Sequence, residues 1–346
     1  MIGDRMSQIS SGSETGCSYP NRSKSADLKR NITYLVVSFV FAIVYQVPGW
    51  PNIFEDINGY PMVDRAVYEN LLLTRNLVID YIHDFTPIMY FTFEWSWHSL
   101  LAYLNRVVGL SADQIFFLIT TFILWRFSFD VLTKIGWQYL PLLINPLVVN
   151  FAFSQLRTAL AIALISFVWR GQRGIGLTVV IYILATTIHT AMIIFLICHI
   201  ASHLFKNNNY FNFLALASIG AAIAIAIGPL REMILSTIND RRTDYLDMAS
   251  SAAYLSFWIL LLLFHGVIFK FRNRIMSLDA RYSITILSIV AINILTGGYS
   301  TRFIAASFPS LLISMKDLGG NRSRMIFSIF IPYTIILWMY WFRILG

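Results

Sequence analysis

The chain has 346 residues, of which 57% are hydrophobic and 13% are charged, and apolar runs recur along most of its length. Soluble folds of this size do not show that profile, so we expect a polytopic membrane protein. The net charge of +8 is spread singly or in pairs between the apolar runs, as the positive-inside rule expects, which argues against nucleic-acid binding. The two cysteines, Cys17 and Cys198, supply neither a disulfide framework nor a metal site.

Residues 1–30 are polar and rich in serine, and they show no secretory signal pattern. We expect them to form a disordered cytoplasmic tail ahead of an integral membrane domain over residues 31–346. The first span is expected at Tyr34–Val47, with its basic leader on the inside. Residues 48–114 then mix acidic and aromatic side chains, which predicts a periplasmic segment of amphipathic helices that lie on the bilayer or dip into it.

The rest of the chain alternates between apolar runs and short polar connections, with a second periplasmic loop at about 229–251. The expected spans are Ile115–Leu124, Trp137–Phe153, Phe153–Arg170, Leu177–Thr187, Thr190–Leu204, Phe211–Gly228, Ala252–Phe269, Tyr282–Leu295, Phe303–Met315 and Met325–Trp341. Arg126 is assigned to an inside connection. The predicted fold is an all-α, polytopic transmembrane helical bundle of about eleven spans, with its C-terminus outside.

The helix that opens at Ser154-Gln155-Leu156-Arg157 places a cation in its first turn, where the helix dipole is already positive. Arg157 therefore calls for an anion. The alternating topology puts the starts of three helices, at Arg157, after His189 and at Arg302, on the same outer face, and helix starts bind phosphate. We expect these three residues to form an outward-facing anion site. The alternatives are arginines that snorkel to lipid headgroups and a histidine that merely ends a helix.

Other residues extend this hypothesis. The loop at 229–251 adds Arg231, Arg241 and Arg242 as further anion-binding cations. Carboxylate and aromatic pairs could bind sugar hydroxyls, although solvated loop charge is the more common explanation for any one of them. The candidate sugar-binding residues are Asp64 with Tyr68, Tyr245, Asp247 and Tyr299.

Glu94 is the most unusual acid of the chain, because it lies among aromatic residues in the sequence FTFEWSWHS. Burial would raise the pKa of its carboxyl group and suit it to general-base catalysis. The competing interpretation is an interfacial acid that pairs with Arg106 or Arg75. His199 and His265 lie in apolar helices and are interpreted as structural residues.

Several motifs do not occur in the sequence: a glycine-rich phosphate loop, D-x-D, HExxH and GxSxG. A cytoplasmic enzyme that uses a nucleotide is therefore not expected, and neither a cofactor nor a metal is predicted. Arginines without a metal site indicate a leaving group such as a lipid-linked phosphate or pyrophosphate, neutralised by guanidinium groups.

Four stretches together resemble the EpsG-type, Wzy-like polysaccharide polymerases of bacteria. They are FEWSWHSLLAYLNRVVGLS, SQLRTALAIAL, IHTAMIIFL and YSTRFIAASF, in that order along the chain. Typical members have an Arg-Gln pair and a His-x-Ser/Ala pair, whereas here Gln155 precedes Arg157 and His189 is followed by Thr190-Ala191. The resemblance covers roughly residues 34–340, and a GT-C-like architecture would fit such an enzyme.

The resemblance implies a glycosyltransferase of the bacterial inner membrane that joins undecaprenyl-pyrophosphate-linked repeat units at the periplasmic face into an exopolysaccharide or O-antigen. Arg157, Gln155, His189 and Arg302 would then hold the pyrophosphate. Glu94 or Asp64 would orient or deprotonate the acceptor hydroxyl, and His189 is a further catalytic candidate. The implied partners are the lipid-linked oligosaccharide and membrane lipids, with a flippase and a chain-length regulator as further candidates.

Two other classes of protein stay open. A transporter or flippase of lipid-linked sugars also needs cations facing a pyrophosphate, but it would place ionisable residues in mid-membrane. A glycan ligase shares the donor chemistry of a polymerase. A membrane acyltransferase would need a histidine with an acidic neighbour, which His189 lacks in the nearby sequence.

Overall fold

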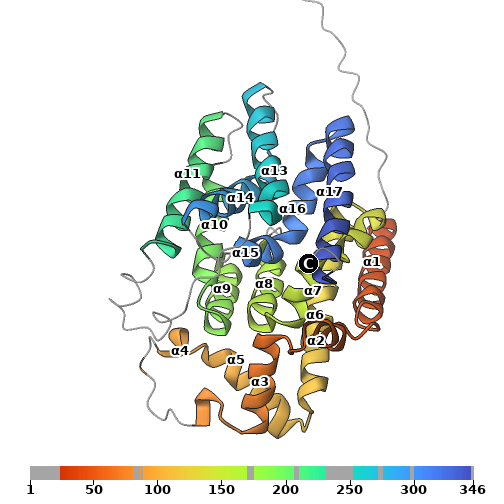
Figure 1. Cartoon of the computed structure of the whole chain (residues 1–346), viewed down its shortest axis with the longest axis vertical. Coiled ribbons are helices and arrows are strands. Elements are labelled where there is room, and N and C mark those ends of the chain that lie inside the picture. The colour runs from red at the N-terminus through yellow and green to blue at the C-terminus, as the bar shows by residue number, and fades with distance from the viewer. Residues whose placement is uncertain are drawn as a thin grey trace, which may run out of the picture.

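The computed structural model describes residues 24–80, 86, 89–169, 175–205, 210–230, 252–271, 276–296 and 300–343. Every regular element in these ranges is a helix. Figure 1 shows a bundle of long helices with a layer of short helices, α2–α5, across one end. We call this end the α2–α5 face.

The α2–α5 layer occupies the segment between the first two long helices. Its elements are α2 (Trp50–Asn58), α3 (Val63–Leu73), the 3₁₀ helix η1 (Val78–Asp80), α4 (Met89–Thr92), α5 (Trp95–Ala102) and the π-helix η2 (Tyr103–Val107). The neighbouring long helices are α1 (Lys24–Val44) and α6 (Ala112–Lys134). α1 thus begins inside the segment that was expected to be a disordered tail, and that expectation is wrong for residues 24–30.

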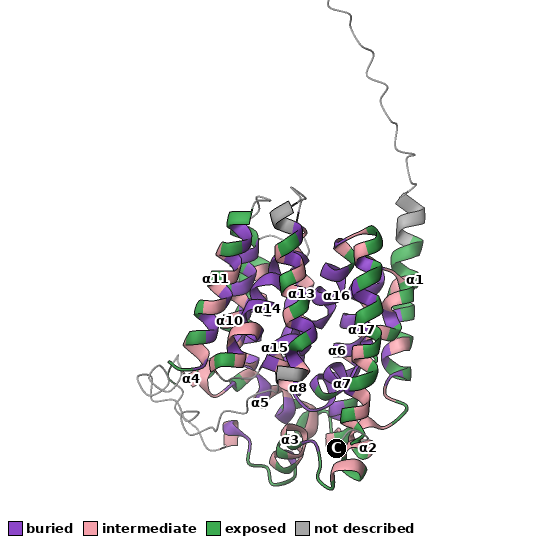
Figure 2. Ribbon diagram, turned by 45° about the horizontal axis from the view of Figure 1, so that its top comes forward, coloured by how far each residue is buried: buried purple, intermediate pink, exposed green. Residues whose placement is uncertain are grey.

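The remaining helices build the body of the bundle. They are the 3₁₀ helix η3 (Trp137–Leu143), α7 (Pro146–Phe153), α8 (Leu156–Trp169), α9 (Ile175–Ile188), α10 (Met192–Leu204), α11 (Tyr210–Ile227), α13 (Ala252–Phe271), α14 (Leu278–Thr296), α15 (Ser300–Ala306), α16 (Phe308–Asp317) and α17 (Gly320–Trp341). In the described residues, buried side chains gather inside the bundle and exposed ones on its outer faces (Figure 2).

Four helices are long and apolar enough to cross a membrane, namely α6, α11, α14 and α17, and α7 with α8 adds a fifth if the bent pair is one span. The outer faces of the bundle expose large apolar side chains, as on α1 at Val36, Val40 and Val44. A helical membrane protein has this character. The expected all-α class and membrane-spanning helices are therefore confirmed in the described residues. About eleven spans are not, because the apolar helices within α9, α10 and α13 are shorter.

α6 departs from the expectation of a short span followed by a loop. The Ser111 side chain and Gln114 cap its start reciprocally, and the helix continues to Lys134. Arg126 lies inside it and donates to Asp130, one turn further on, at 2.6 Å. Both side chains are buried. The placement of Arg126 in a connection is wrong, because an ion pair four residues apart lets both charges remain in an apolar helix.

The expected helix at Phe153–Arg170 begins later, and a sharp corner precedes it. Asn145 caps the start of α7, because its side chain accepts a hydrogen bond from the N–H of Leu147 at 3.0 Å, and the helix ends at Phe153. The axes of α7 and α8 differ by 101° across Ser154-Gln155. The expected span at Phe303–Met315 is likewise divided, with α15 and α16 meeting at Ser307. Arg157 lies in the first turn of α8, after the corner, whereas Arg302 lies in the first turn of α15, before the division at Ser307.

Close packing between α11 and α14 fixes one side of the bundle. A Cβ atom at Gly220 would lie 2.4 Å from the carbonyl oxygen of Thr285 and 2.7 Å from Cβ of Ser288. Only glycine fits there, because real Cβ atoms do not approach backbone so closely. The two helices therefore meet backbone against backbone at this point.

Candidate functional site

Glu94 lies at the junction of α4 and α5, in the left-handed conformation with a φ of 55°. Its side chain is 3% exposed. A carboxylate buried this deeply requires charged or hydrogen-bonding partners. It finds them on two other elements, because one oxygen pairs with Nη1 of Arg157 and the other lies 2.6 Å from Nδ1 of His189. The strained backbone at Glu94 thus aims a buried acid at two cationic or protonatable groups.

His189 lies in the turn between α9 and α10, and the α4–α5 segment docks on that turn. The Thr190 hydroxyl donates to the carbonyl oxygen of Phe91 at 2.8 Å. The hydroxyl groups of Ser96 and Thr187 also lie 2.8 Å apart. These contacts fix the position of Glu94 relative to His189. The Nδ1 contact with a carboxylate fixes the orientation of the imidazole ring.

Arg157, in the first turn of α8, faces the same acid. A cation at a helix start adds to the positive end of the helix dipole, so an anion is needed to offset it. In this structure the anion is Glu94 of the chain itself. The guanidinium also lies 5.8 Å from the ring centroid of Tyr68. Tyr68 is buried in α3, which raises the pKa of its phenol, while the nearby Arg157 opposes that rise.

Asp64 and Arg302 form the outer, looser part of the arrangement. Arg302 Nη2 lies 3.9 Å from the Asp64 carboxylate, and the two side chains are 41% and 31% exposed. At that exposure a pair of charges holds together weakly. Both charges act on the Tyr68 phenol, as do Arg157 and Glu94. We call the six residues Asp64, Tyr68, Glu94, Arg157, His189 and Arg302 the ionic cluster.

The structure thus brings together six of the residues singled out from the sequence. Gln155 lies two positions before Arg157 but lines a separate cleft. The remaining candidates lie outside the described residues, namely Arg231, Arg241, Arg242, Tyr245, Asp247 and Tyr299. The alternative pairing of Glu94 with Arg106 is wrong. Arg106 instead makes two hydrogen bonds to Asp80, at 2.6 and 2.7 Å, which lower the pKa of that carboxyl group.

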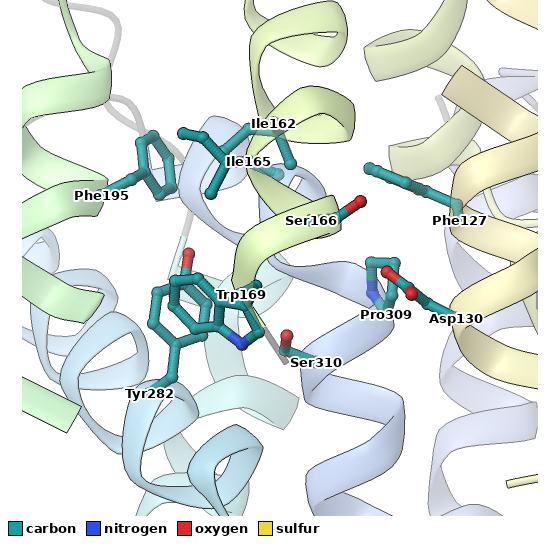
Figure 3. A pocket seen from close by; sticks show the side chains of 11 residues that line it. Phe127, Asp130, Ile162, Ile165, Ser166, Trp169, Phe195, Tyr282, Pro309 and Ser310 are labelled. Atoms are coloured by element: carbon teal, nitrogen blue, oxygen red, sulfur yellow. The ribbon is translucent and has the colours of Figure 1, made fainter. Parts of the chain in front are cut away.

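Sequence reasoning missed one buried ionic arrangement away from this cluster. Besides Asp130, Arg126 contacts Ser166 of α8, donating to its carbonyl oxygen at 2.9 Å. Asp130 and Ser166 line a small cavity of about 30 Å³, which Tyr282 and Ser310 also line (Figure 3). The signal was present in the sequence, because an arginine and an aspartate four residues apart within an apolar run indicate a paired helix position.

Comparison of the chain with protein-family models, curated proteins and solved structures finds no match. The chemistry of the ionic cluster therefore rests on its own geometry. It combines a buried carboxylate, an imidazole held by that carboxylate, and two arginines on helix starts that remain partly exposed, at 24% for Arg157 and 41% for Arg302. Such a set can move a proton next to a bound anion.

Proposed function

We propose that the chain is a membrane glycosyltransferase that polymerises lipid-pyrophosphate-linked oligosaccharides into a surface polysaccharide. The observation that supports this most directly is the ionic cluster, in which a carboxylate–histidine pair and two arginines from distant segments meet on one face. A glycosyl transfer from a lipid pyrophosphate needs both components. A base must take the acceptor proton, and cations must stabilise the departing pyrophosphate.

In the proposed reaction, the acceptor hydroxyl oxygen forms a bond to the anomeric carbon of the donor sugar. The bond from that carbon to the pyrophosphate oxygen breaks, and its electron pair leaves with the lipid pyrophosphate. The hydroxyl proton passes to Nε2 of His189, since Nδ1 faces Glu94. Glu94 then stabilises the imidazolium, as the carboxylate does in other carboxylate–histidine pairs.

Arg157 and Arg302 are proposed to hold the pyrophosphate. A guanidinium has five N–H donors in a flat fork, so Arg157 can bind Glu94 and a phosphate oxygen together. Arg302 is the more exposed of the two and its contact with Asp64 is long, at 3.9 Å. An incoming phosphate would compete well for it. Asp64 would then be released to the acceptor sugar, beside Tyr68.

The proposed orientation places the α2–α5 face on the periplasmic side of a bacterial inner membrane, with the basic start of α1 in the cytoplasm. Trp341, at the end of α17, lies 5.7 Å from Phe54 of α2 between ring centroids, so α17 ends on the α2–α5 face. α1 and α17 thus both run toward that face. An odd number of crossings, about eleven with the shorter helices included, would give this arrangement.

A membrane O-acyltransferase that modifies the polysaccharide is the second candidate. The acidic neighbour that His189 lacks in the nearby sequence is supplied by Glu94, which lies 95 positions away. A histidine–carboxylate pair also suits acyl transfer to a hydroxyl. The two functions differ in whether glycan length or glycan acylation depends on the cluster.

The test is to replace Arg157 or Arg302 by alanine in cells that make the glycan, and to separate the surface glycan by size. The proposal expects single repeat units with no long chains, at unchanged protein level. The matched control is Arg75→Asn, which removes an exposed arginine from the same layer and keeps a residue that tolerates its φ of 53°. Long glycan that lacks acyl groups would favour the acyltransferase. Normal length and acylation in both alanine variants would rule out the proposed site.

A further inference from the structure

A cleft of about 220 Å³ lies beside the corner between α7 and α8. Six side chains give the cleft its chemistry: Phe54, Asn150, Gln155, Tyr254, Thr301 and Trp341. They come from α2, α7, the corner, α13, α15 and α17. The described residues that line it include aromatic rings, two amides and two hydroxyl groups, but no charged side chain.

The side-chain amide of Gln155 bears on which class of ligand the cleft can bind. Its side chain is buried, at 9% exposed, and Oε1 accepts no hydrogen bond from any residue that the structure describes. A carbonyl oxygen in this state needs a donor, and because Oε1 is shielded, a ligand in the open cleft reaches it only when the amide turns toward the opening. The described residues that line the cleft supply no cation for an anion. The cleft therefore favours a neutral, hydroxyl-bearing ligand, because a hydroxyl group can both donate to and accept from the amides.

The aromatic wall of the cleft supports the same class. Trp341 and Phe54 lie 5.7 Å apart between ring centroids, and Trp341 is also 6.1 Å from Trp50. Flat apolar faces next to a few directed polar groups fit a ligand that has an apolar ring face and hydroxyl groups at its edge. Asn150, exposed on α7, adds an amide that can both donate and accept. A neutral sugar ring has these properties.

The cleft and the ionic cluster share two helix starts. Gln155 precedes Arg157 by two residues at the start of α8, and Thr301 precedes Arg302 at the start of α15. One side of each start bears the cation and the other side lines the uncharged cleft. We propose that this cleft is a subsite for a neutral sugar residue of the glycan, separate from the pyrophosphate position. The inference rests on the proposed function and adds a location for the saccharide.

The experiment uses the full chain in a detergent without a sugar headgroup, because a maltoside headgroup would compete for the cleft. Two probes are added separately: inorganic pyrophosphate, and the lipid-free repeat oligosaccharide released by mild acid from the lipid-linked intermediates of the producing cells. Binding is measured as the shift in the midpoint of thermal unfolding over a range of probe concentrations. The variants are Gln155→Ala and Asn150→Ala, with Asn76→Ala, an exposed amide between α3 and η1, as control.

We expect the oligosaccharide to stabilise the unsubstituted chain and Asn76→Ala equally, with roughly five- to tenfold weaker apparent affinity in each cleft variant, the size of one lost hydrogen bond. The pyrophosphate shift should stay unchanged in the cleft variants. If Gln155→Ala does not fold, Asn150→Ala and Thr301→Val at the edge of the cleft answer the same question.

Three results would overturn the proposal: no oligosaccharide binding, equal oligosaccharide binding in the cleft variants, or loss of pyrophosphate binding in those variants. A short-chain phosphatidylglycerol that binds in place of the oligosaccharide, in a manner that depends on Gln155, would assign the cleft to lipid instead. Failure of the proposed function gives a different pattern. Pyrophosphate would then bind neither the unsubstituted chain nor its Arg157→Ala variant, while dependence of saccharide binding on Gln155 would persist.

Discussion

His189 and Glu94 lie 95 positions apart in the chain and meet at 2.6 Å, between Nδ1 and a carboxylate oxygen. The other oxygen of Glu94 pairs with Arg157, so one buried acid connects the α9–α10 turn to the start of α8. This double contact makes Glu94 the centre of the ionic cluster. Its loss would remove the carboxylate that orients the histidine and the negative charge that Glu94 supplies to Arg157.

Replacing Glu94 by glutamine should therefore abolish most of the activity. Glutamine keeps the volume and can still accept hydrogen bonds, but it cannot neutralise an imidazolium during proton transfer. We expect at least about a hundredfold fall in the rate of repeat-unit joining, in line with the loss of an acid–base group. The measurement is turnover of purified protein with a lipid-linked repeat unit. Activity within about threefold of the unsubstituted protein would exclude Glu94 from the reaction.

The two arginines should respond differently to lysine. Arg157 contacts Glu94 within a buried geometry that a single ammonium group cannot reproduce for both Glu94 and a phosphate. Arg302 lies at the longer distance of 3.9 Å from Asp64, in a more exposed position. We expect Arg157→Lys to give single repeat units and Arg302→Lys to keep shortened chains, as read from a glycan size ladder at matched protein level. The opposite order would contradict the assignment of Arg157 to the inner position.

Gly220 should tolerate no side chain, because a Cβ atom would collide with the backbone of α14. Gly220→Ala is expected to cost about 1–3 kcal/mol through overpacking, and a larger residue more. The measurement is the midpoint of thermal unfolding in detergent. Gly176→Ala is the control, since the added Cβ would meet nothing within 4 Å. Equal midpoints for the two variants would show that α11 and α14 are not packed so closely.

The buried pair in α6 predicts different effects on stability for single and double substitutions. Arg126→Leu or Asp130→Leu alone removes one partner of a buried ion pair and should destabilise by about 3–5 kcal/mol. The double leucine variant removes both charges and should recover most of that loss. A double variant as unstable as the single ones would indicate that the contacts between Arg126 and Ser166 matter more than the charge balance.

Acid should weaken the α2–α5 layer through Asp80. Hydrogen bonds from Arg106 lower the pKa of its carboxyl group in the folded protein. The pair therefore stabilises the fold above the unfolded pKa of about 3.9, and that contribution is lost as the pH falls through the folded value. Both groups are partly exposed, so it amounts to at most about 1 kcal/mol. Asp80→Asn should lower the unfolding midpoint at pH 7, and the difference should shrink as the pH falls below about 3.9. A difference that does not depend on pH would contradict this linkage.

The class of fold could be predicted from the sequence, because a long apolar run in a membrane must form its backbone hydrogen bonds internally, and a helix does so. The interruptions of the helices could not. Ser154-Gln155 contains neither proline nor glycine, yet α7 and α8 turn by 101° there. The length of α6 was missed for the reverse reason. An isolated arginine at position 126 indicates a loop, and only its pairing with Asp130 explains why it lies within a helix.

The sequence could predict which residues belong to the candidate site, but it could not predict which of them contact one another. Alternating topology indicated that Arg157, His189 and Arg302 would share one face, and the structure places Arg157 and His189 on Glu94 and Arg302 near Asp64. The pairing of Glu94 depends on how the α4–α5 segment docks across the bundle. No local pattern specifies a partner 63 or 95 residues away. Gln155 was assigned to the pyrophosphate because of its position beside Arg157, whereas its side chain faces the uncharged cleft.

The corner at Ser154-Gln155 also determines the rotational register of α8. Successive residues of a helix are about 100° apart around its axis, so one residue inserted at the corner would turn every later side chain of α8 by that angle. Arg157 would then point away from Glu94 although neither residue had changed. A family of chains with this architecture would tolerate length changes in its connections far more readily than at these two residues. The distance from the corner to Arg157 is thus as much a part of the site as the arginine itself.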